Sequence, residues 1–525
     1  MPPPRRSRPD RLPTGTVSPR TAGAPWWRYQ RPQAPAPITD RRRVESTVDA
    51  SHAEGVAEPT EAPETTPSRR TGLEQASGNQ RAGAVPGILA ACCFAVVILT
   101  ARLEIAAIGL VLVPAGAILA ALALGQVIAR RHPDEQWMTW LLVIGIAAKL
   151  IASAIRYYTI VDEFGGGDAE IYDIWGSRYY EYWTGGGDEP DTMGKGSAET
   201  NWVRWFTGIV YVVFGPNIIV AFLVFGLLAA IGSYFWYRAA ADAVPFLDKR
   251  LYFALVFFAP SIMYWPSSIG KEALMQLGVG GLTLATAKVM TNRLLTGLII
   301  ALPAGWLVWR VRPHLLAIAA FAAGIAYLFG RVRRSEALSS TSLLRPIGMV
   351  VVAFLVFFAI SEGAQFLGME QFSLSSLEAE LEETSETTAQ GGSQFDSGGG
   401  SLTPLTLPQG AMTVLLRPFP WEVETGLQIL ASLEGAAIAV YIVHRRRSLA
   451  LSLRRARTTP FLLYCWTFVL VYAVAFSAIS NFGNLVRQRA LILAALFVLL
   501  ALDTKRAARE SPPPDSRDLG LTGRR

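Results

Sequence analysis

Long apolar runs separated by short, arginine-rich segments dominate the chain from residue 86 onward. A helix needs about 20 predominantly apolar residues to cross a bilayer. Backbone polar groups inside a bilayer are satisfied only in helices or closed barrels, and runs of this length fit helices. The pattern therefore predicts an all-α integral membrane protein with a bundle of about twelve spans: 86–101, 105–129, 137–156, 206–236, 251–266, 269–290, 294–309, 313–330, 346–366, 422–443, 460–480 and 490–503.

The distribution of arginine predicts the orientation of this bundle. The basic segments between alternate spans all fall on one side of the predicted membrane, together with an arginine-rich segment before residue 85. Because cytoplasmic loops carry the excess of Lys and Arg, we expect both termini in the cytoplasm. The division is then a disordered arm rich in Pro, Arg and Ser (1–84), a transmembrane domain (85–505) with outer loops 157–205 and 367–421, and a cytoplasmic tail (506–525).

The composition agrees with a membrane protein and excludes several other classes. Of the 525 residues 51% are hydrophobic and 17% are charged, which is far from a soluble average. The positive-inside pattern accounts for the net charge of +7, so we expect no nucleic-acid partner. Cys92, Cys93 and Cys465 lie inside apolar runs without disulfide or metal spacing. We predict no cofactor and no metal. A divalent ion at the acidic outer loop is an alternative that no residue pattern in the sequence supports.

The first outer loop contains the stretch GGGDAEIYDIWG (165–176), which is too polar for lipid and too aromatic for an ordinary loop. From Asp168 onward, large aromatic residues recur at a spacing of three and four, which is typical of one face of a helix. This pattern predicts an amphipathic helix on the outer membrane surface. Its expected lipid-facing stripe is Tyr172, Trp175, Tyr179 and Tyr182, and its expected wetter face is Asp173, Ser177 and Glu181.

Three acidic residues lie where the chain leaves the membrane before this helix, namely Asp162, Glu163 and Asp168. Asp168 stands at the predicted helix start, where aspartate is also a favoured N-cap. Asp162 and Glu163 equally fit a solvated loop pair. All three are candidates for an acid–base role at the outer surface.

A lysine and a glutamate follow the short outer turn PSSIG at 266–270. Lys271 would occupy the first turn of the next helix, where the helix dipole disfavours a positive charge. The free N–H groups of a helix start, together with a lysine, nevertheless make a good phosphate site. Glu272 would stabilise the same helix start.

Further cations stand at the outer ends of predicted spans, against the positive-inside trend. They lie around Pro313, in the stretch LLRPFPWE, and just before the last predicted span. Arginine suits bidentate contact with phosphate, although each of these residues could instead snorkel to lipid headgroups. Together they predict a shared anionic ligand, such as a lipid-linked phosphate, bound by Arg310, Arg312, His314, Arg417, Arg487 and Arg489.

Two stretches resemble the GT-C superfamily of polytopic membrane glycosyltransferases. GGGDAEIYDIWGSRY (165–179) resembles a GD-x3-Y element, and FFAPSIMYWPSSIGKEALM (257–275) is similar to a P-S-x3-W-S-x3-K-E segment of bacterial polysaccharide-assembly proteins. The resemblance covers roughly 150–315 and the multi-span layout. This chain departs from the pattern of the family in one respect. Two predicted spans, within 86–129, precede the span that leads into the acidic loop.

The resemblance implies an enzyme of the bacterial plasma membrane that uses a polyprenyl-linked sugar donor and a glycan or protein acceptor. An outer-loop carboxylate would act on the acceptor hydroxyl, a contribution usually worth about 10²–10⁴ in rate. Asp168 fits that role best, and Tyr172 is the tyrosine of the same element. Membrane lipids and other envelope-assembly proteins are the further partners expected.

Three other functions remain open. A polysaccharide polymerase or ligase outside the GT-C superfamily would use outer arginines to bind lipid pyrophosphate. A transporter or flippase of lipid-linked glycans needs charges near the bilayer midplane and often internal repeats, and Lys149 is nearly the only such charge. A scaffold would dock partners through the N-terminal arm.

Overall fold

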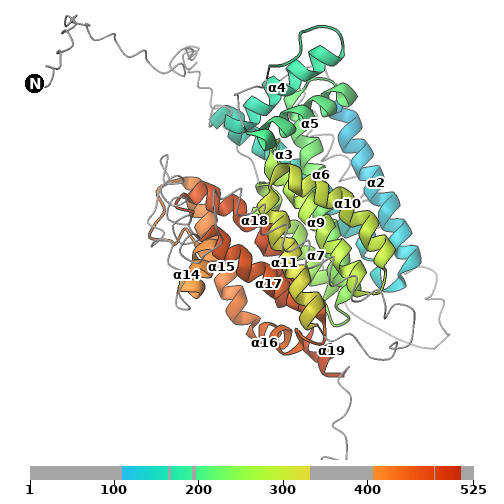
Figure 1. Cartoon of the computed structure of the whole chain (residues 1–525), viewed down its shortest axis with the longest axis vertical. Helices are drawn as coiled ribbons and strands as arrows, with labels where there is room; N and C mark the ends of the chain where they lie inside the picture. The colour runs from blue at the N-terminus through green and yellow to red at the C-terminus, as the bar shows by residue number, and fades with distance from the viewer. Residues whose placement is uncertain (1–108, 164–166, 192–196, 331–405, 478, 510–525) are drawn as a thin grey trace, which may run out of the picture. The chain divides into compact units, whose positions relative to one another are not determined.

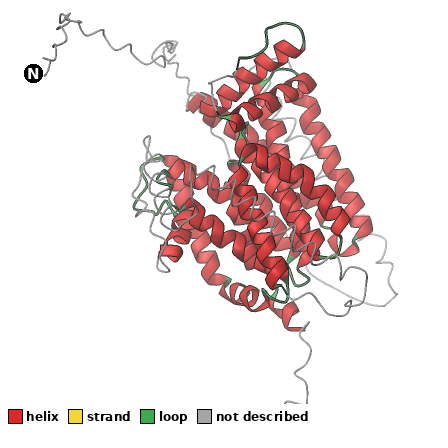
Figure 2. Cartoon of the chain, viewed as in Figure 1, coloured by secondary structure: helices red, strands yellow, loops and turns green. Residues whose placement is uncertain are grey.

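The computed structural model describes residues 109–163, 167–191, 197–330, 406–477 and 479–509 (Figure 1). Within these ranges every regular element is a helix, which confirms the predicted all-α class (Figure 2). The arm 1–84, the predicted spans 86–101 and 346–366, and most of the loop 367–421 lie outside the described residues.

Among the described residues, seven helices are long and apolar enough to cross a membrane, and one sharply bent pair would make an eighth. The chain is therefore a multi-pass membrane protein, with fewer spans shown than the twelve predicted. The seven are α2 (Gly109–Arg131), α3 (Met138–Tyr158), α6 (Ile218–Ala243), α9 (Lys271–Met290), α10 (Leu294–Val311), α15 (Gly426–His444) and α18 (Phe482–Leu500). The bent pair is α16 (Arg446–Arg455) with α17 (Pro460–Phe476), and α11 (Pro313–Phe329) is a shorter apolar helix.

The single span predicted over 206–236 is wrong, because the chain breaks at Gly215-Pro216. Helix α5 (Ala198–Phe214) ends there and α6 begins only at Ile218. Gly215 adopts a φ of 87°, which favours glycine, and Pro216 has no backbone N–H to continue a helix. The Asn217 side chain then caps α6 by accepting a hydrogen bond from the Ile219 N–H at 3.0 Å. The break frees α5 to pack outside the bundle.

The span predicted over 251–266 is also interrupted, at Pro260. Helix α7 (Lys249–Phe258) gives way to the short α8 (Pro260–Tyr264), and Ala259 between them is extended with a ψ of 130°. The residue before proline avoids the helical region for steric reasons. Lys149 of α3 is buried and donates to the carbonyl oxygens of Ile262 at 2.8 Å and Met263 at 3.0 Å.

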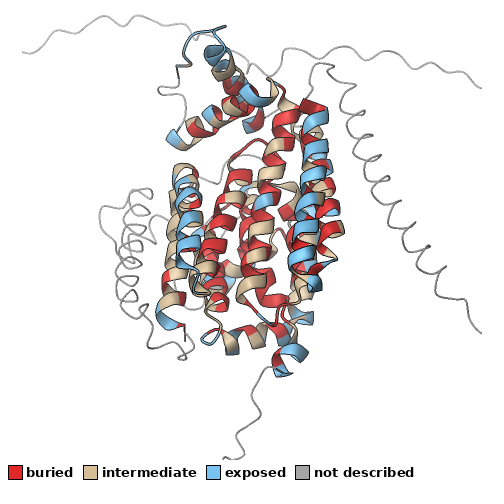
Figure 3. Ribbon diagram, turned by 90° about the vertical axis from the view of Figure 1, so that its right-hand side faces the viewer, coloured by how far each residue is buried: buried red, intermediate tan, exposed pale blue. Residues whose placement is uncertain are grey.

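Helices α6 and α9 cross at two glycines in the buried centre of the bundle. A Cβ atom on Gly232 would lie 2.1 Å from the Gln276 carbonyl oxygen, and one on Gly280 would lie 2.4 Å from the Gly232 carbonyl oxygen. Small residues allow membrane helices to approach this closely. Buried residues follow the facing sides of the helices, while exposed residues follow the outer sides (Figure 3).

An ion-pair network joins the ends of α3, α6, α7 and α9 at the end of the bundle predicted to be cytoplasmic. Glu135 is buried and lies between two cations of this network. A hydrogen bond from Lys249 lowers the pKa of neighbouring Asp134 below its ordinary value. The pairs are Glu135 with Arg238 (3.2 Å) and Lys249 (2.6 Å), and Asp242 with Arg238 (2.6 Å) and Lys288 (2.6 Å).

The glycine crossing gives a prediction about stability. Gly280→Ala should lower the free energy of unfolding by about 1–3 kcal/mol, because its methyl group would meet backbone rather than a movable side chain. Gly116→Ala is the matched control, since a Cβ there has nothing within 4 Å. Thermal unfolding in detergent compares the two variants. Equal transition temperatures would contradict the close crossing.

Candidate functional site

Helices α4 (Gly167–Trp183) and α5 form a packed pair over the opposite end of the bundle. The helix predicted from Asp168 is confirmed, but its faces agree with the prediction only in part, since Tyr182 and Glu181 are exposed as expected. Tyr172 and Trp175, which were expected to face lipid, are buried, and Ile171 and Ile174 are exposed. Asp173, expected on the wetter face, accepts a hydrogen bond from the Tyr211 hydroxyl of α5.

Two glycines explain why the aromatic stripe turns toward α5. A Cβ atom on Gly208 would lie 2.5 Å from the Tyr179 Cβ, and one on Gly176 would lie 2.6 Å from the Thr207 methyl group. The two helices therefore approach closely, and the large rings of α4 fill the space beside the glycines. Burial raises the pKa of the Tyr172 hydroxyl above its ordinary value, so this hydroxyl stays protonated.

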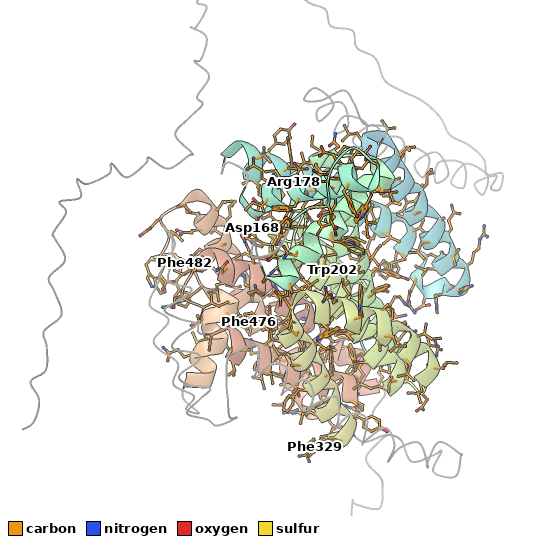
Figure 4. All side chains as sticks on the ribbon, turned by 45° about the horizontal axis from the view of Figure 1, so that its top comes forward. Asp168, Arg178, Trp202, Phe329, Phe476 and Phe482 are labelled. Carbon is orange, nitrogen blue, oxygen red and sulfur yellow. The ribbon has the colours of Figure 1, made fainter. Side chains whose placement is uncertain are left out.

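Asp168 is the second residue of α4, and its side chain is exposed. The helix begins at Gly167, so Asp168 lies in the first turn instead of at the N-cap, where its charge complements the helix dipole. The Asp168 carboxylate interacts electrostatically with Lys271. In Figure 4 Asp168 lies at the far end of the molecule from Phe329, the last residue of α11. The side chains of Asp162 and Glu163 lie outside the described residues.

Lys271 is the first residue of α9, as the sequence predicted. A buried turn at 266–270 precedes it, and Gly270 has a φ of 159°. Within the described ranges, the Lys271 ammonium group makes no hydrogen bond or ion pair. It is instead attracted at longer range by the carboxylates of Asp168, Glu199 and Glu272.

Arg312 connects four helices at this end of the bundle. It precedes α11 and donates to Glu272 of α9 at 3.0 Å and to Gln488 of α18 at 2.9 Å. The Tyr472 hydroxyl of α17 donates to the same Gln488 side chain at 3.1 Å. His314 follows two residues later, with its ring 5.8 Å from that of Phe476, and interacts electrostatically with Arg312 and Lys271.

An open groove of about 670 Å³ runs between α5 and α10 beside this cluster. Four indole rings make up most of its wall, and three of them are between 38% and 51% exposed. Trp202, labelled in Figure 4, anchors the wall by stacking on Phe206 with centroids 5.4 Å apart. The full lining is Ala198, Asn201, Trp202, Trp205, Trp306, Trp309 and Arg310.

Glu199 links the groove to Lys271, although no motif or spacing in the sequence singles it out. Burial alone would raise the pKa of Glu199, but the Ser197 hydrogen bond and the charges of Lys271 and Arg310 together lower it. Glu199 is therefore an anion at neutral pH. It lies within electrostatic range of both cations, so it places Arg310 and Lys271 in one site.

A second residue that sequence reasoning missed is Arg156, in the last turn of α3, at the end predicted to face outward. Its guanidinium lies 4.6 Å from the Tyr264 ring centroid and 4.5 Å from that of Trp265. Arg487 lies over the same Trp265 ring at 5.5 Å, so two arginines contact one indole. The signal that could have identified Arg156 is the one used for the other outer arginines, a cation on the outer side against the positive-inside trend.

Arg489 and Arg417 do not join this cluster. Helix α18 begins at Phe482 and not at residue 490, so the prediction that Arg487 and Arg489 precede the last span is wrong. Residues two apart on a helix point to different sides. Arg489 is fully buried and pairs with Glu434 of α15 at 2.8 Å, while also donating to the carbonyl oxygens of Leu415, Arg417 and Ala431. Arg417 pairs with Glu422 at 3.1 Å.

The structure therefore gathers most of the predicted site residues into one cluster, here called the outer cluster. Five cations and three carboxylates give it a net charge of +2. In the described part of the chain, no group of three or more His, Cys, Asp or Glu side chains is placed to hold a metal ion. The members of the outer cluster are Arg156, Asp168, Tyr172, Glu199, Lys271, Glu272, Arg310, Arg312, His314 and Arg487.

Comparison of the chain with models of known protein families, with curated proteins and with solved structures finds no match.

The contacts of Arg489 give a prediction that separates a structural from a ligand-binding arginine. Glu434→Gln should lower the free energy of unfolding by about 3 kcal/mol, because it leaves a buried guanidinium without its counter-charge. Glu422→Gln is the control, since its pair with Arg417 is partly exposed and worth about 1 kcal/mol or less. Thermal unfolding in detergent gives both values. A Glu434→Gln protein as stable as the control would show that Arg489 is not structural.

Proposed function

We propose that this chain is a membrane glycosyltransferase that transfers a sugar from a polyprenyl-phosphate-linked donor to an envelope glycan or protein acceptor. The reaction takes place at the outer face of a bacterial plasma membrane, with both termini in the cytoplasm. The observation that carries the proposal is the exposed carboxylate of Asp168 within electrostatic range of Lys271, an ammonium group without an ion pair among the described residues. The resemblance of 165–179 and 257–275 to GT-C enzymes supports the same function.

The cations of the outer cluster fall into two groups with different tasks. Arg312 is held by Glu272 and Gln488 and keeps the helix ends together. Lys271 and Arg310 make no hydrogen bond or ion pair with other described residues, so their charges are available to a ligand. A phosphate at Lys271 also meets the free N–H groups at the start of α9, where the helix dipole favours an anion.

The groove suits the apolar part of the same donor. Its exposed indole rings form an apolar wall, and Arg310 is its charged residue. A polyprenyl chain along Trp306 and Trp309 would place its phosphate at Arg310, toward Glu199 and Lys271. Because Glu199 is an anion, it also opposes entry of a second phosphate, which favours a monophosphate over a pyrophosphate donor.

Asp168 is the acid–base group in this proposal. The acceptor hydroxyl oxygen attacks the anomeric carbon of the donor, and the bond from that carbon to the phosphate oxygen breaks. The hydroxyl proton passes to the Asp168 carboxylate, and the bonding electrons leave with the lipid phosphate. Lys271 and Arg310 stabilise the negative charge that develops on the departing phosphate. The packing of α4 on α5 fixes the distance between base and phosphate site.

The first test compares binding and turnover of a polyprenyl-phosphate sugar by the full chain in lipid nanodiscs. Asp168→Asn should lose about 10²–10⁴ in turnover while it retains donor binding, because only the proton acceptor is removed. Lys271→Ala should weaken donor binding. Asp188→Asn, in the exposed loop after α4, is the matched control and should behave as the wild type. Unchanged turnover in Asp168→Asn would refute the carboxylate mechanism and favour a polymerase or ligase outside the GT-C superfamily.

The second test addresses the groove. Trp306→Ala combined with Trp309→Ala should raise the KM for a long-chain donor about tenfold, through lost apolar contact, and leave kcat unchanged. A donor with a short, soluble prenyl chain should show little change. Trp421→Ala is the control, because its ring is 79% exposed and lies outside the groove. An equal KM change for both donors would assign the groove to another ligand.

A further inference from the structure

The end of the bundle away from the outer cluster has a basic surface that the proposed function does not use. Helix α16 and the short α19 (Thr504–Arg509) contact each other there, and Arg455 of α16 reaches the Ala507 carbonyl oxygen at 3.5 Å. The stretches 445–459 and 504–509 contain no acidic residue. The exposed cations of this surface are Arg446, Arg447, Arg454, Arg457, Lys505, Arg506 and Arg509.

Helix α16 turns across the end of the bundle instead of continuing α17. The two helices are bent by 114° at the break between them, and Pro460 begins α17 (Figure 1). Arg445, just before α16, holds the start of this helix against the bundle by donating to the carbonyl oxygens of Leu500 at 2.8 Å and Leu502 at 2.9 Å. Because α17 has the composition of a span, α16 lies at the level of the membrane surface.

Helix α16 turns two serines and two leucines toward the protein, with Leu449 and Leu451 partly buried against the core. Ser448 and Ser452, one turn apart, are buried against the protein, and they bond the Leu502 carbonyl oxygen at 3.0 Å and the Trp466 indole N–H at 3.1 Å. Leu453, by contrast, is 64% exposed between exposed arginines. A soluble surface would place the leucine inward. An outward face that combines leucine with arginine is typical of helices that contact an anionic membrane surface.

We propose that α16 and α19 form a binding surface for anionic phospholipid headgroups in the leaflet at this end of the bundle. The arginines contact the phosphodiester groups, and Leu453 contacts the upper acyl chains. Charge complementarity favours lipid as the occupant, since each Lys or Arg near an anionic membrane surface contributes about 1 kcal/mol of attraction. The side chains already lie where the headgroups of the surrounding bilayer begin. This inference does not depend on the proposed glycosyltransferase activity.

The test measures retained lipid by native mass spectrometry on the full chain in detergent micelles doped with phosphatidylglycerol or phosphatidylcholine. The wild type should retain phosphatidylglycerol in preference to phosphatidylcholine. Combining Arg447→Gln, Arg454→Gln and Arg457→Gln should lower the affinity for phosphatidylglycerol at least about tenfold and leave phosphatidylcholine unchanged. If this triple variant does not fold, Arg454→Gln alone should lower the same affinity about fivefold.

The matched control removes three exposed cations from the same end of the bundle, through Arg130→Gln, Arg131→Gln and Arg250→Gln. It should keep the wild-type preference. An equal loss in both triple variants would show a general charge effect and overturn the proposal, as would the absence of any lipid preference in the wild type. Tighter binding of polyglutamate than of phosphatidylglycerol would make this a protein-docking surface and would also overturn it.

Discussion

Every backbone polar group within a bilayer must find its partner inside the protein, and this constraint governs where the helices of this chain can break. Both breaks that depart from the sequence pattern are supported in this way. Asn217 caps the new helix after Gly215-Pro216, and Lys149 bonds two carbonyl oxygens of α8 after the break at Pro260. The outer cluster lies just beyond these breaks. The first allows α5 to pair with α4, and the second leads into the buried turn from which Lys271 emerges.

The charged side chains discussed above form two groups. One group has an opposite charge within hydrogen-bond distance, and the other does not. Arg489 and the network around Glu135 have a counter-charge within hydrogen-bond distance, so they hold helices together at little net gain or loss in free energy. Lys271 and Arg310 have only longer-range attraction from carboxylates among the described residues. A protein that bears the cost of partly burying such cations gains from an anion that completes their coordination. The incomplete pairing is therefore the physical feature that separates a ligand site from a structural one.

The two ends of the bundle consequently present different surface chemistry. At one end, a carboxylate, available cations and an aromatic groove converge, which is suited to an amphiphile with a phosphate group. At the other end, the ion pairs among α3, α6, α7 and α9 are complete, and the exposed arginines of α16 lie outside them. Helices α9 and α10 run between the two ends, with Lys271 and Lys288 at opposite ends of α9. The glycine crossing packs α9 closely against α6 between these two ends.

The sequence by itself determined the all-α membrane class, most of the apolar helices and eight of the ten residues of the outer cluster. Helix periodicity and the positive-inside trend depend on local composition, so Asp168, Lys271 and Arg312 could be selected without a structure. Tertiary packing decided the rest. Which face of α4 is buried depends on Gly176 and Gly208 beside it, and whether an arginine binds a ligand or Glu434 depends on which helix lies opposite. Glu199 and Arg156 gain their place in the site only through contacts with distant segments, because electrostatic and packing energies depend on distance in space and not along the chain.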